Sequence, residues 1–426
     1  MVCQHPEMTH TQTVSSEPDF TVDHFAPPGR SLRIAFVTET YPPEVNGVAL
    51  TMARIVDGIA ARHHEIQLVR PRQNPENTDQ LTNRFHEVFT RGLPILRYPD
   101  LRMGLPSKRA LVRLWSHKRP DVVHIATEGP LGWSALQAAR LLKLPVCSDF
   151  RTNFHAYCKH YGVGWLQRPI MGYLRKFHNR THVTMVPTEA LRQELADAGF
   201  LRLCVVNQGV DVRLFNPKQR SEALRSQWGA APNDFVALYV GRLAPEKNLE
   251  VLVASFASIK ASRPNARFVV VGDGPERIKL QQRMPYAMFA GQRHGEDLAA
   301  HYASADLFVF PSLTEISGNV TAEAMASGLP VLAFDRAAAS ELITSGENGL
   351  LIRFGSSAAF VDTAASLTGK RQWLHYMGSR AHQRVAALDW EQVVLRFEQV
   401  LRRTIDEVQQ PDVLTAKLHP GSVQSL

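Results

Sequence analysis

From residue 32 onward, short apolar runs rich in β-branched residues alternate with longer segments whose apolar positions recur at helical spacing. This alternation is typical of parallel sheets whose strands are joined by crossover helices. Six runs in the first half predict strands at Leu32–Val37, Ile66–Val69, Val122–Ile125, Val146–Phe150, Val183–Val186 and Leu203–Val206. After a proline-bearing, charged stretch at 216–233, six more predict strands at Phe235–Val240, Arg267–Val271, Tyr286–Phe289, Leu307–Phe310, Val331–Phe334 and Leu350–Ile352.

The break between the two sets favours two doubly wound α/β domains, facing each other across a cleft, over one large sheet. We expect an N-terminal domain over 31–210 and a C-terminal domain over 211–385. A strong helical pattern from Trp390 to about Val408 predicts a helix within 386–410 that packs back towards the N-terminal domain. The segments 1–30 and 411–426 have no such pattern, and we expect them to be flexible.

Cysteine usage and hydropathy indicate the cellular compartment of the protein. The four cysteines, Cys3, Cys147, Cys158 and Cys204, form no C-x-x-C pair and are too irregularly spaced for a zinc site or a disulfide framework. The chain has no apolar run of about 18 residues, and its first 30 residues lack the apolar core of a secretory signal. We therefore expect a cytoplasmic protein, either free or bound peripherally to the cytoplasmic face of the inner membrane.

The net charge of +8 and the pI near 9.4 favour anionic partners, namely nucleotide phosphates, an acidic lipid surface or nucleic acid. The sequence contains no RNP-like aromatic pattern, zinc finger or obvious recognition helix. We therefore expect no nucleic-acid partner.

The most informative motif is PSLTEISGNVTAEAMASGLP at 311–330, which follows a predicted strand and leads into a predicted helix. Amides near 317–320 would lack partners at the helix N-terminus, which suits phosphate binding. Glu315 would lie on the loop at the carboxyl end of the strand, with Glu323 about two turns into the helix. Ligands bind at that edge of open α/β sheets.

Two carboxylates at this spacing allow other interpretations. The acid and base of a glycosidase are separated by roughly 5 to 10 Å. An eight-residue offset along one helix gives roughly 12 Å, so hydroxyl binding fits better than an acid/base pair. In isolation, the pattern is also typical of an ordinary strand–loop–helix unit with a solvated glutamate at each end.

The segment VGRLAPEKN at 240–248 follows the first strand of the second set. Gly241 would let the backbone approach a ligand, while Arg242 and Lys247 would supply two cations where a departing diphosphate gains charge. The alternative is a solvated loop with a Glu–Lys pair. A glycine turn at 272–276 is only weak evidence of a ligand site by itself.

In the first half, PPEVNGV at 42–48 follows the first strand. Asn46 is a plausible helix N-cap, and the helix would bury Val48, Met52, Ile55, Val56 and Ile59. Gly47 is placed to bring backbone amides near a phosphate, although simple turn chemistry explains it equally well.

The N-G-V, G-R-L-x-x-E-K-N, G-D-G-P and P-S-x-x-E-x-x-G-N-x-x-x-E-A-M-A-S-G-x-P-V motifs occur in this order on these strand–helix junctions. Together they resemble family 4 of the retaining GT-B glycosyltransferases. Within that family, the chain is most similar to bacterial GDP-mannose-dependent α-mannosyltransferases and to sulfoquinovosyl- or glucosyl-lipid synthases. The resemblance runs from about Arg33 to Arg403.

The resemblance implies a GDP- or UDP-sugar donor, a lipid or glycan acceptor and a role for each matching residue. Glu323 would hold the ribose hydroxyls, and Glu315 a hydroxyl of the donor sugar. Arg242 and Lys247 would neutralise the leaving diphosphate. The remaining donor-site residues would be Gly47, Ile316, Ser317, Gly318, Asn319 and Val320, and His155 would contact the sugar near the reaction centre.

The sequence departs from the family at Ser317, where relatives usually have Phe, so the donor sugar stays open between mannose and glucose types. The resemblance also implies front-face transfer in which the leaving phosphate accepts the proton of the acceptor. Because two cations can replace a metal ion and no D-x-D cluster is present, we expect no cofactor and metal-independent transfer.

The stretch 91–119 has eight basic residues and one acid, Asp100. After Pro106, a helix capped by Ser107 would place Ala110, Leu111, Leu114 and Trp115 on one side and basic residues on the other. Such a helix suits an anionic lipid surface, or it is a core-packed helix with a solvated basic face. The candidate surface residues are Arg102, Lys108, Arg109 and Arg113.

Two rival functions stay open at this point. The glycine turn at 272–276 prompts a nicotinamide-dependent oxidoreductase, although it does not match G-x-G-x-x-G and does not follow the first strand of the chain. The second rival function is that of a binding protein, which holds a nucleotide sugar without transferring it.

Overall fold

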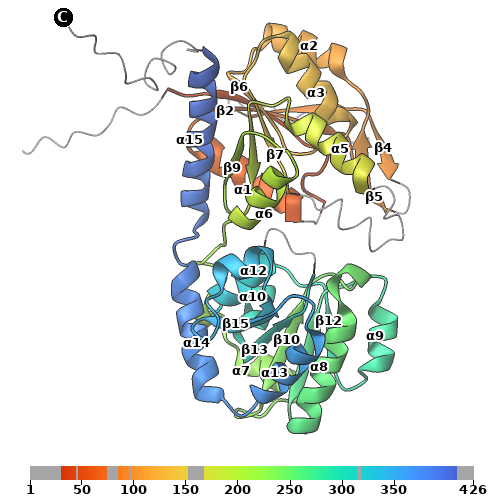
Figure 1. Ribbon diagram of the computed structural model, residues 1–426, viewed down its shortest axis with the longest axis vertical. Coiled ribbons are helices and arrows are strands. Elements are labelled where there is room, and N and C mark those ends of the chain that lie inside the picture. The colour runs from red at the N-terminus through yellow and green to blue at the C-terminus, as the bar shows by residue number, and fades with distance from the viewer. Residues whose placement is uncertain are drawn as a thin grey trace, which may run out of the picture. The chain divides into compact units, whose positions relative to one another are not determined.

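The computed structural model describes residues 30–44, 47–73, 85–95, 98–151, 167–313 and 318–409. The elements below belong to one compact unit that begins at Leu32. Among the described residues, two parallel sheets of seven and six strands are flanked by helices (Figure 1). The expected doubly wound α/β architecture is confirmed.

The first sheet has the order β3-β2-β1-β6-β7-β8-β9. Its strands are β1 (Arg33–Val37), β2 (Glu65–Pro71), β3 (Phe85–Thr90), β6 (Val122–Ile125), β7 (Val146–Asp149), β8 (Val183–Val186) and β9 (Leu203–Val205). The second sheet has the order β12-β11-β10-β13-β14-β15. Its strands are β10 (Val236–Val240), β11 (Arg267–Val271), β12 (Met288–Gly291), β13 (Leu307–Phe310), β14 (Val331–Phe334) and β15 (Gly349–Ile352).

The helices associated with the first sheet are α1 (Gly47–Ala61), α2 (Lys108–His117), α3 (Pro130–Leu141), α5 (Gln167–His178), α6 (Glu189–Asp197) and α15 (Trp390–Gln409). Those of the second are α7 (Glu222–Gln227), α8 (Leu249–Ser262), α9 (Arg277–Arg283), α10 (Gly295–Ala303), α11 (Asn319–Ala326), α12 (Ala337–Leu342), α13 (Ser357–Ser366) and α14 (Arg371–Val385).

All twelve predicted strands are present, and their ends agree with the prediction or differ from it by at most two residues. The strand predicted at 286–289 is displaced as a whole and lies two residues later, as β12. The structure adds β3 at one edge of the first sheet and an antiparallel hairpin, β4 (Gly92–Ile95) with β5 (Tyr98–Gly104). The sequence did not predict β3 because its described positions are mostly half-buried, so it lacks the apolar run of a central strand.

Alternate residues of β1 enter two cores on opposite faces of the first sheet. Ile34 and Phe36 pack in a cluster with residues of α1 and α15, whereas Ala35 and Val37 pack with residues of α2 and α3. The predicted inward residues of α1 are buried, except for Val48, which is partly buried. One face of the sheet is therefore covered by a helix from the far end of the chain, visible in Figure 1.

Helix α15 is fixed by a stacked ring and a buried carboxylate. Phe397 is fully buried, with its ring centroid 5.9 Å from that of Phe36 and 4.8 Å from that of His124. The adjacent Glu398 is also buried and accepts hydrogen bonds from Arg62 and Arg402. These contacts join α15 to the first sheet and to the end of α1.

We predict that Phe397→Ala lowers the free energy of unfolding by about 3–5 kcal/mol, because it leaves a cavity between α15 and the sheet. Urea denaturation of the full chain, followed by circular dichroism, measures this. The exposed Gln399→Ala on the same helix is the control and should change the midpoint little. Equal midpoints for the two variants would contradict the assigned packing.

Candidate functional site

The chain order of the second sheet reverses between its two central strands, β10 and β13. In doubly wound sheets, ligands bind outside the carboxyl ends of the strands at such a reversal. The loops that leave these two strands carry the motifs at 240–248 and 311–330. The Nδ2 of Asn248 donates a hydrogen bond of 3.2 Å to the carbonyl of Pro311, which ties the two loops together. The structure therefore brings the two motifs side by side at the expected edge.

The glycine turn after β11 supports the loop after β10. A Cβ at Gly272 would lie 2.0 Å from the carbonyl oxygen of Gly241, and one at Gly274 would lie 2.4 Å from that of Leu243. The N–H of Leu243 donates to the carbonyl of Asp273 at 2.9 Å. The glycines are thus required by close backbone packing, which accounts for this motif without a direct contact to a ligand.

The two predicted cations lie on this loop in different settings. The side chain of Arg242 is 42% exposed, and its Nη1 is 3.7 Å from Oε1 of Glu246, which is buried. The ammonium of Lys247 is 5.7 Å from the centre of the Phe310 ring, within range of a cation–π interaction. Glu246 is buried beside Arg242, so its carboxylate is not solvated.

Helix α11 starts at a position that only glycine can occupy. Gly318 is its N-cap with φ of 69°, and a Cβ there would lie 2.3 Å from the Cβ of Ala338 on α12. No side chain caps the helix. The first amides of α11, at Asn319 and Val320, therefore have no intrahelical acceptor, as expected for an anion-binding terminus. The buried Oδ1 of Asn319 has no hydrogen-bond partner among the described residues.

Glu323 is the fifth residue of α11, so it lies about one turn into the helix. The expectation of two turns was wrong because the helix begins at Asn319. The Oε2 atom of Glu323 accepts a hydrogen bond of 3.0 Å from the hydroxyl of Tyr302, a fully buried residue of α10. Tyr302 was not predicted as a site residue from the sequence. The signal available was that a buried tyrosine usually requires a hydroxyl partner.

Gly47 is the first residue of α1 and is exposed. A Cβ at this position would lie 3.7 Å from Nδ2 of Asn319, so the structure brings Gly47 close to the start of α11. Four other predicted site residues, His155, Glu315, Ile316 and Ser317, lie outside the described residues, as does the proposed N-cap Asn46.

Helix α2 turns its apolar side into the protein. Leu111 and Trp115 are buried in the core with α3, and Leu114 is partly buried. Ala110 is exposed, so its assignment to the apolar side was wrong. Ser107 occupies the N-cap position, but its hydroxyl donates to the carbonyl of Leu105 and does not cap the helix.

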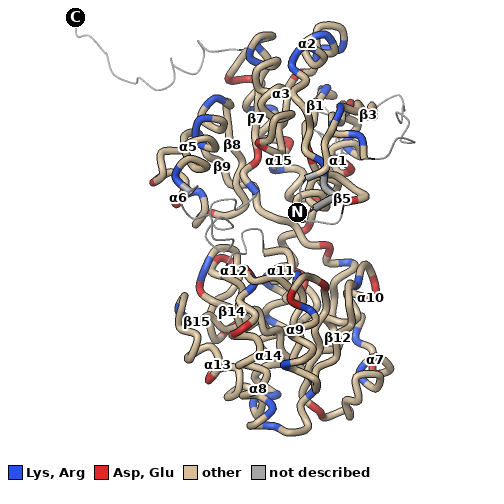
Figure 2. Tube along the Cα trace, turned by 90° about the vertical axis from the view of Figure 1, so that its right-hand side faces the viewer, with Lys and Arg blue, Asp and Glu red and all other residues tan. Residues whose placement is uncertain are grey.

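The basic face of α2 is solvent-accessible. Lys108, Arg109 and Arg113 are exposed, and Figure 2 shows basic residues along this helix. Arg102 is half-buried on β5, where it pairs with Pro94 of β4. No helix in the described part of the chain is both long and apolar enough to cross a bilayer. Within the same ranges, no group of three His, Cys, Asp or Glu side chains could hold a metal ion.

The first sheet reverses its order between β1 and β6, and each of these strands is followed by an acid. Glu39, after β1, accepts a 2.9 Å hydrogen bond from the N–H of Leu131 at the start of α3. Burial raises the pKa of Glu39 to about 7, and the nearby charge of Glu128 adds to this shift. The carboxylate of Glu128 is 3.2 Å from Nε2 of His178. Neither acid was predicted from the sequence, because no spacing pattern marks them.

Because the pKa of Glu39 is higher in the folded than in the unfolded protein, its contribution to stability is full below pH 4.5. That contribution is lost as the pH rises through about 7, with a total change of up to about 3 kcal/mol. We predict that Glu39→Gln becomes more stable relative to the parent between pH 5 and pH 8. Urea titrations across this range measure the difference. The exposed Glu391→Gln is the control, and a pH-independent difference for Glu39→Gln would contradict the assignment.

A helix N-terminus, two cations and an oriented carboxylate at the reversal point of a doubly wound sheet define a nucleotide-binding α/β protein. Comparison with known families narrows this class. Residues 45–214 match the family described as Glycosyltransferase Family 4, and residues 234–369 match Glycosyl transferases group 1.

Two curated relatives match the chain over most of their own length. The chain is 34% identical to a GDP-mannose-dependent alpha-mannosyltransferase of Mycolicibacterium smegmatis, over 87% of this chain and 98% of that protein. It is 26% identical to an alpha-monoglucosyldiacylglycerol synthase of Acholeplasma laidlawii, over 75% of this chain and 84% of that protein. The chain therefore belongs to glycosyltransferase family 4 and is a glycosyltransferase.

Solved structures support the fold. Sucrose-phosphate synthase from Thermosynechococcus elongatus superimposes with a TM-score of 0.71 over 87% of this chain and 98% of that one, at 19% identity. The fold is accordingly of the GT-B class, as the sequence motifs predicted.

Proposed function

We propose that this enzyme transfers a hexose of the mannose or glucose type from a nucleoside diphosphate sugar to a hydroxyl group of a lipid or glycan, with retention of the anomeric configuration. One observation carries the proposal. The uncapped start of α11, the loop with Arg242 and Lys247, and the oriented Glu323 all converge at the reversal point between β10 and β13.

Each part of this edge suits one part of the donor. The amides at the start of α11 bind phosphate oxygens, because they lack intrahelical acceptors. Glu323, whose carboxylate Tyr302 holds in place, binds the ribose hydroxyls. By family resemblance, Glu315 binds a sugar hydroxyl, His155 lies near the reaction centre, and Ile316 and Ser317 shape the sugar pocket. Gly47 meets the donor from the first sheet.

In front-face transfer, the bond from the anomeric carbon to the diphosphate breaks as the acceptor oxygen bonds to the same face. The acceptor proton passes to an oxygen of the leaving diphosphate, so the protein supplies no nucleophile. Negative charge grows on the diphosphate as it departs, and Arg242 and Lys247 stabilise it. These two cations support metal-independent transfer.

The names of the relatives support both candidate donors. The mannosyltransferase supports GDP-mannose, and the glucosyldiacylglycerol synthase supports a glucose donor and a diacylglycerol-like acceptor. Ser317 stands where relatives usually have Phe, so the sugar of the donor stays open between these two types.

Two alternatives have less support. A nicotinamide-dependent oxidoreductase was prompted by the glycine turn at 272–276, but those glycines pack against the loop after β10. A protein that binds nucleotide sugars without transferring them shares the same donor site. The match to glycosyltransferase family 4 favours the transferase.

We predict that the full chain transfers hexose from at least one donor in a panel of GDP- and UDP-sugars, with EDTA present. Glu315→Ala should lower this transfer by 100-fold or more, a loss on the order of 3 kcal/mol, while nucleoside diphosphate still binds. Radiolabelled product formation and titration calorimetry measure the two effects. Transfer that EDTA abolishes and a divalent metal restores would overturn metal independence. Binding without transfer for every donor would favour the binding protein.

We also propose that the basic face of α2 adsorbs the enzyme to an anionic lipid surface. The apolar side of α2 is occupied by the core, so the attachment is electrostatic. The hairpin that precedes α2 in the chain carries Leu93 and Met103, which are cross-strand partners with exposures of 52% and 39%. In this proposal, the pair rests against the headgroup region.

Flotation with vesicles that contain anionic phosphatidylglycerol tests this attachment. Replacement of Lys108, Arg109 and Arg113 by Gln should weaken binding on the order of 100-fold, at about 1 kcal/mol for each charge. The control variant replaces three exposed basic residues in segments around the second sheet by Gln. These residues are Arg213, Lys218 and Arg353. No flotation of the parent at low salt, or equal losses for both variants, would contradict the proposal.

A further inference from the structure

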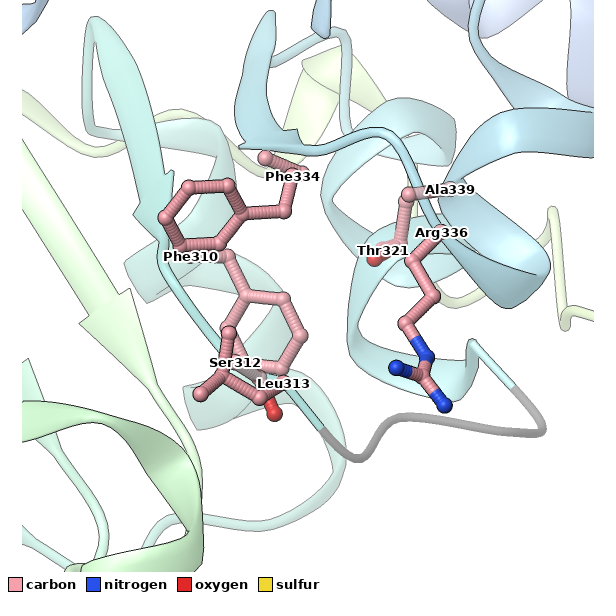
Figure 3. A pocket seen from close by; sticks show the side chains of 8 residues that line it. Phe310, Ser312, Leu313, Thr321, Phe334, Arg336 and Ala339 are labelled. Atoms are coloured by element: carbon pink, nitrogen blue, oxygen red, sulfur yellow. The ribbon is translucent and has the colours of Figure 1, made fainter. Parts of the chain in front are cut away.

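A small pocket lies at the carboxyl ends of β13 and β14. Its described lining consists of Phe310, Ser312, Leu313, Thr321, Ala333, Phe334, Arg336 and Ala339. Figure 3 shows the two phenylalanines and Ser312 on one side, with Thr321, Ala339 and Arg336 on the other. The pocket opens to solvent, and its cavity volume of about 10 Å³ is far below the usual range for a whole small-molecule ligand. The pocket is therefore suited to one chemical group of a larger ligand.

The polar side chains of this pocket favour an anion. Arg336 is exposed and brings a permanent positive charge, while none of the described lining residues is acidic. Thr321 belongs to the first turn of α11, where the helix dipole adds positive potential. The hydroxyl of Ser312 is buried and has no hydrogen-bond partner among the described residues. Such a group is costly to leave unsatisfied, and a bound oxyanion would satisfy it.

Arg336 is held in place before any ligand arrives. Its guanidinium carbon is 4.6 Å from the centre of the Phe354 ring, and this ring is itself 43% exposed. A cation–π contact of this kind restrains the guanidinium group. The next residue, Ala337, has φ of 50°, a left-handed conformation that costs alanine about 1 kcal/mol. Strain of this kind is typical of functional loops.

We propose that Arg336 and Ser312 form an oxyanion subsite that binds a phosphoryl, sulfonyl or carboxyl group of the donor. This inference rests on the proposed donor site at α11 and adds a third cation to Arg242 and Lys247. The anion has two candidate sources, namely the terminal phosphoryl of the nucleoside diphosphate or an acid group on the sugar.

Titration calorimetry of the full chain and of Arg336→Gln tests the subsite. The ligands are GMP, GDP, UMP, UDP, UDP-glucose and UDP-glucuronate. Any of these ligands whose anionic group fills the pocket should bind Arg336→Gln about 10- to 100-fold more weakly than the parent. This is the loss expected when a charge-assisted hydrogen bond is removed. The matched control is Arg353→Gln, which removes an exposed positive charge next to Phe354 but outside the pocket lining.

The ligands distinguish the two sources of the anion. A loss for the diphosphates but not for the monophosphates assigns the pocket to the terminal phosphoryl. A loss for UDP-glucuronate that is absent for UDP-glucose and UDP assigns it to an acid group on the sugar. No loss with any ligand, or the same loss in Arg353→Gln, would overturn the subsite.

A second probe keeps the subsite separate from the donor proposal. Inorganic phosphate should raise the melting temperature of the parent more than that of Arg336→Gln, at constant ionic strength. If the parent binds no nucleotide, the donor proposal fails and the phosphate comparison alone decides the subsite. Equal shifts for the parent and Arg336→Gln would then overturn it.

Discussion

The contact between Gly318 and Ala338 sets the geometry on which the donor edge depends. With 2.3 Å between the Cβ of Ala338 and the place where a Cβ of Gly318 would be, α11 can begin here only at a glycine. That start exposes the first amides of α11 and places Thr321 in the pocket beside Arg336. It also sets Glu323 one turn further on, within reach of Tyr302. A single backbone approach thus aligns groups suited to phosphate, ribose hydroxyls and an additional oxyanion.

The loop that supplies the cations is fixed in a comparable way. Gly272 allows the turn after β11 to press against Gly241, and Asn248 ties the same loop to the carbonyl of Pro311. Glu246 is buried beside Arg242, while the side chain of Arg242 remains accessible. Electrostatic stabilisation of a leaving group is most effective when the charges are held in place before the reaction, because no reorganisation is then needed. The backbone contacts provide this preorganisation.

The sequence predicted the parts of the molecule that are encoded locally. Strands such as β10 and β13 are continuous apolar runs because both of their faces are buried, and the motifs at their ends were assigned to the correct edge. Edge strand β3 escaped prediction because its half-buried positions mix aromatic, charged and polar residues. Tyr302, Glu39 and Arg336 escaped as well. Each acquires its role from a partner distant in the sequence, such as Glu323, Leu131 or Phe354, and no local spacing records such pairs.

The central claim is that the edge of the second sheet at β10 and β13 holds the donor nucleotide. A crystal structure of the full chain with bound nucleoside diphosphate tests this most directly. The account predicts phosphate density at the amides of Asn319 and Val320, ribose hydroxyls at Glu323, and Arg242 and Lys247 beside the terminal phosphate. Nucleotide density at the edge of the first sheet, beside Glu39 and Glu128, would contradict it.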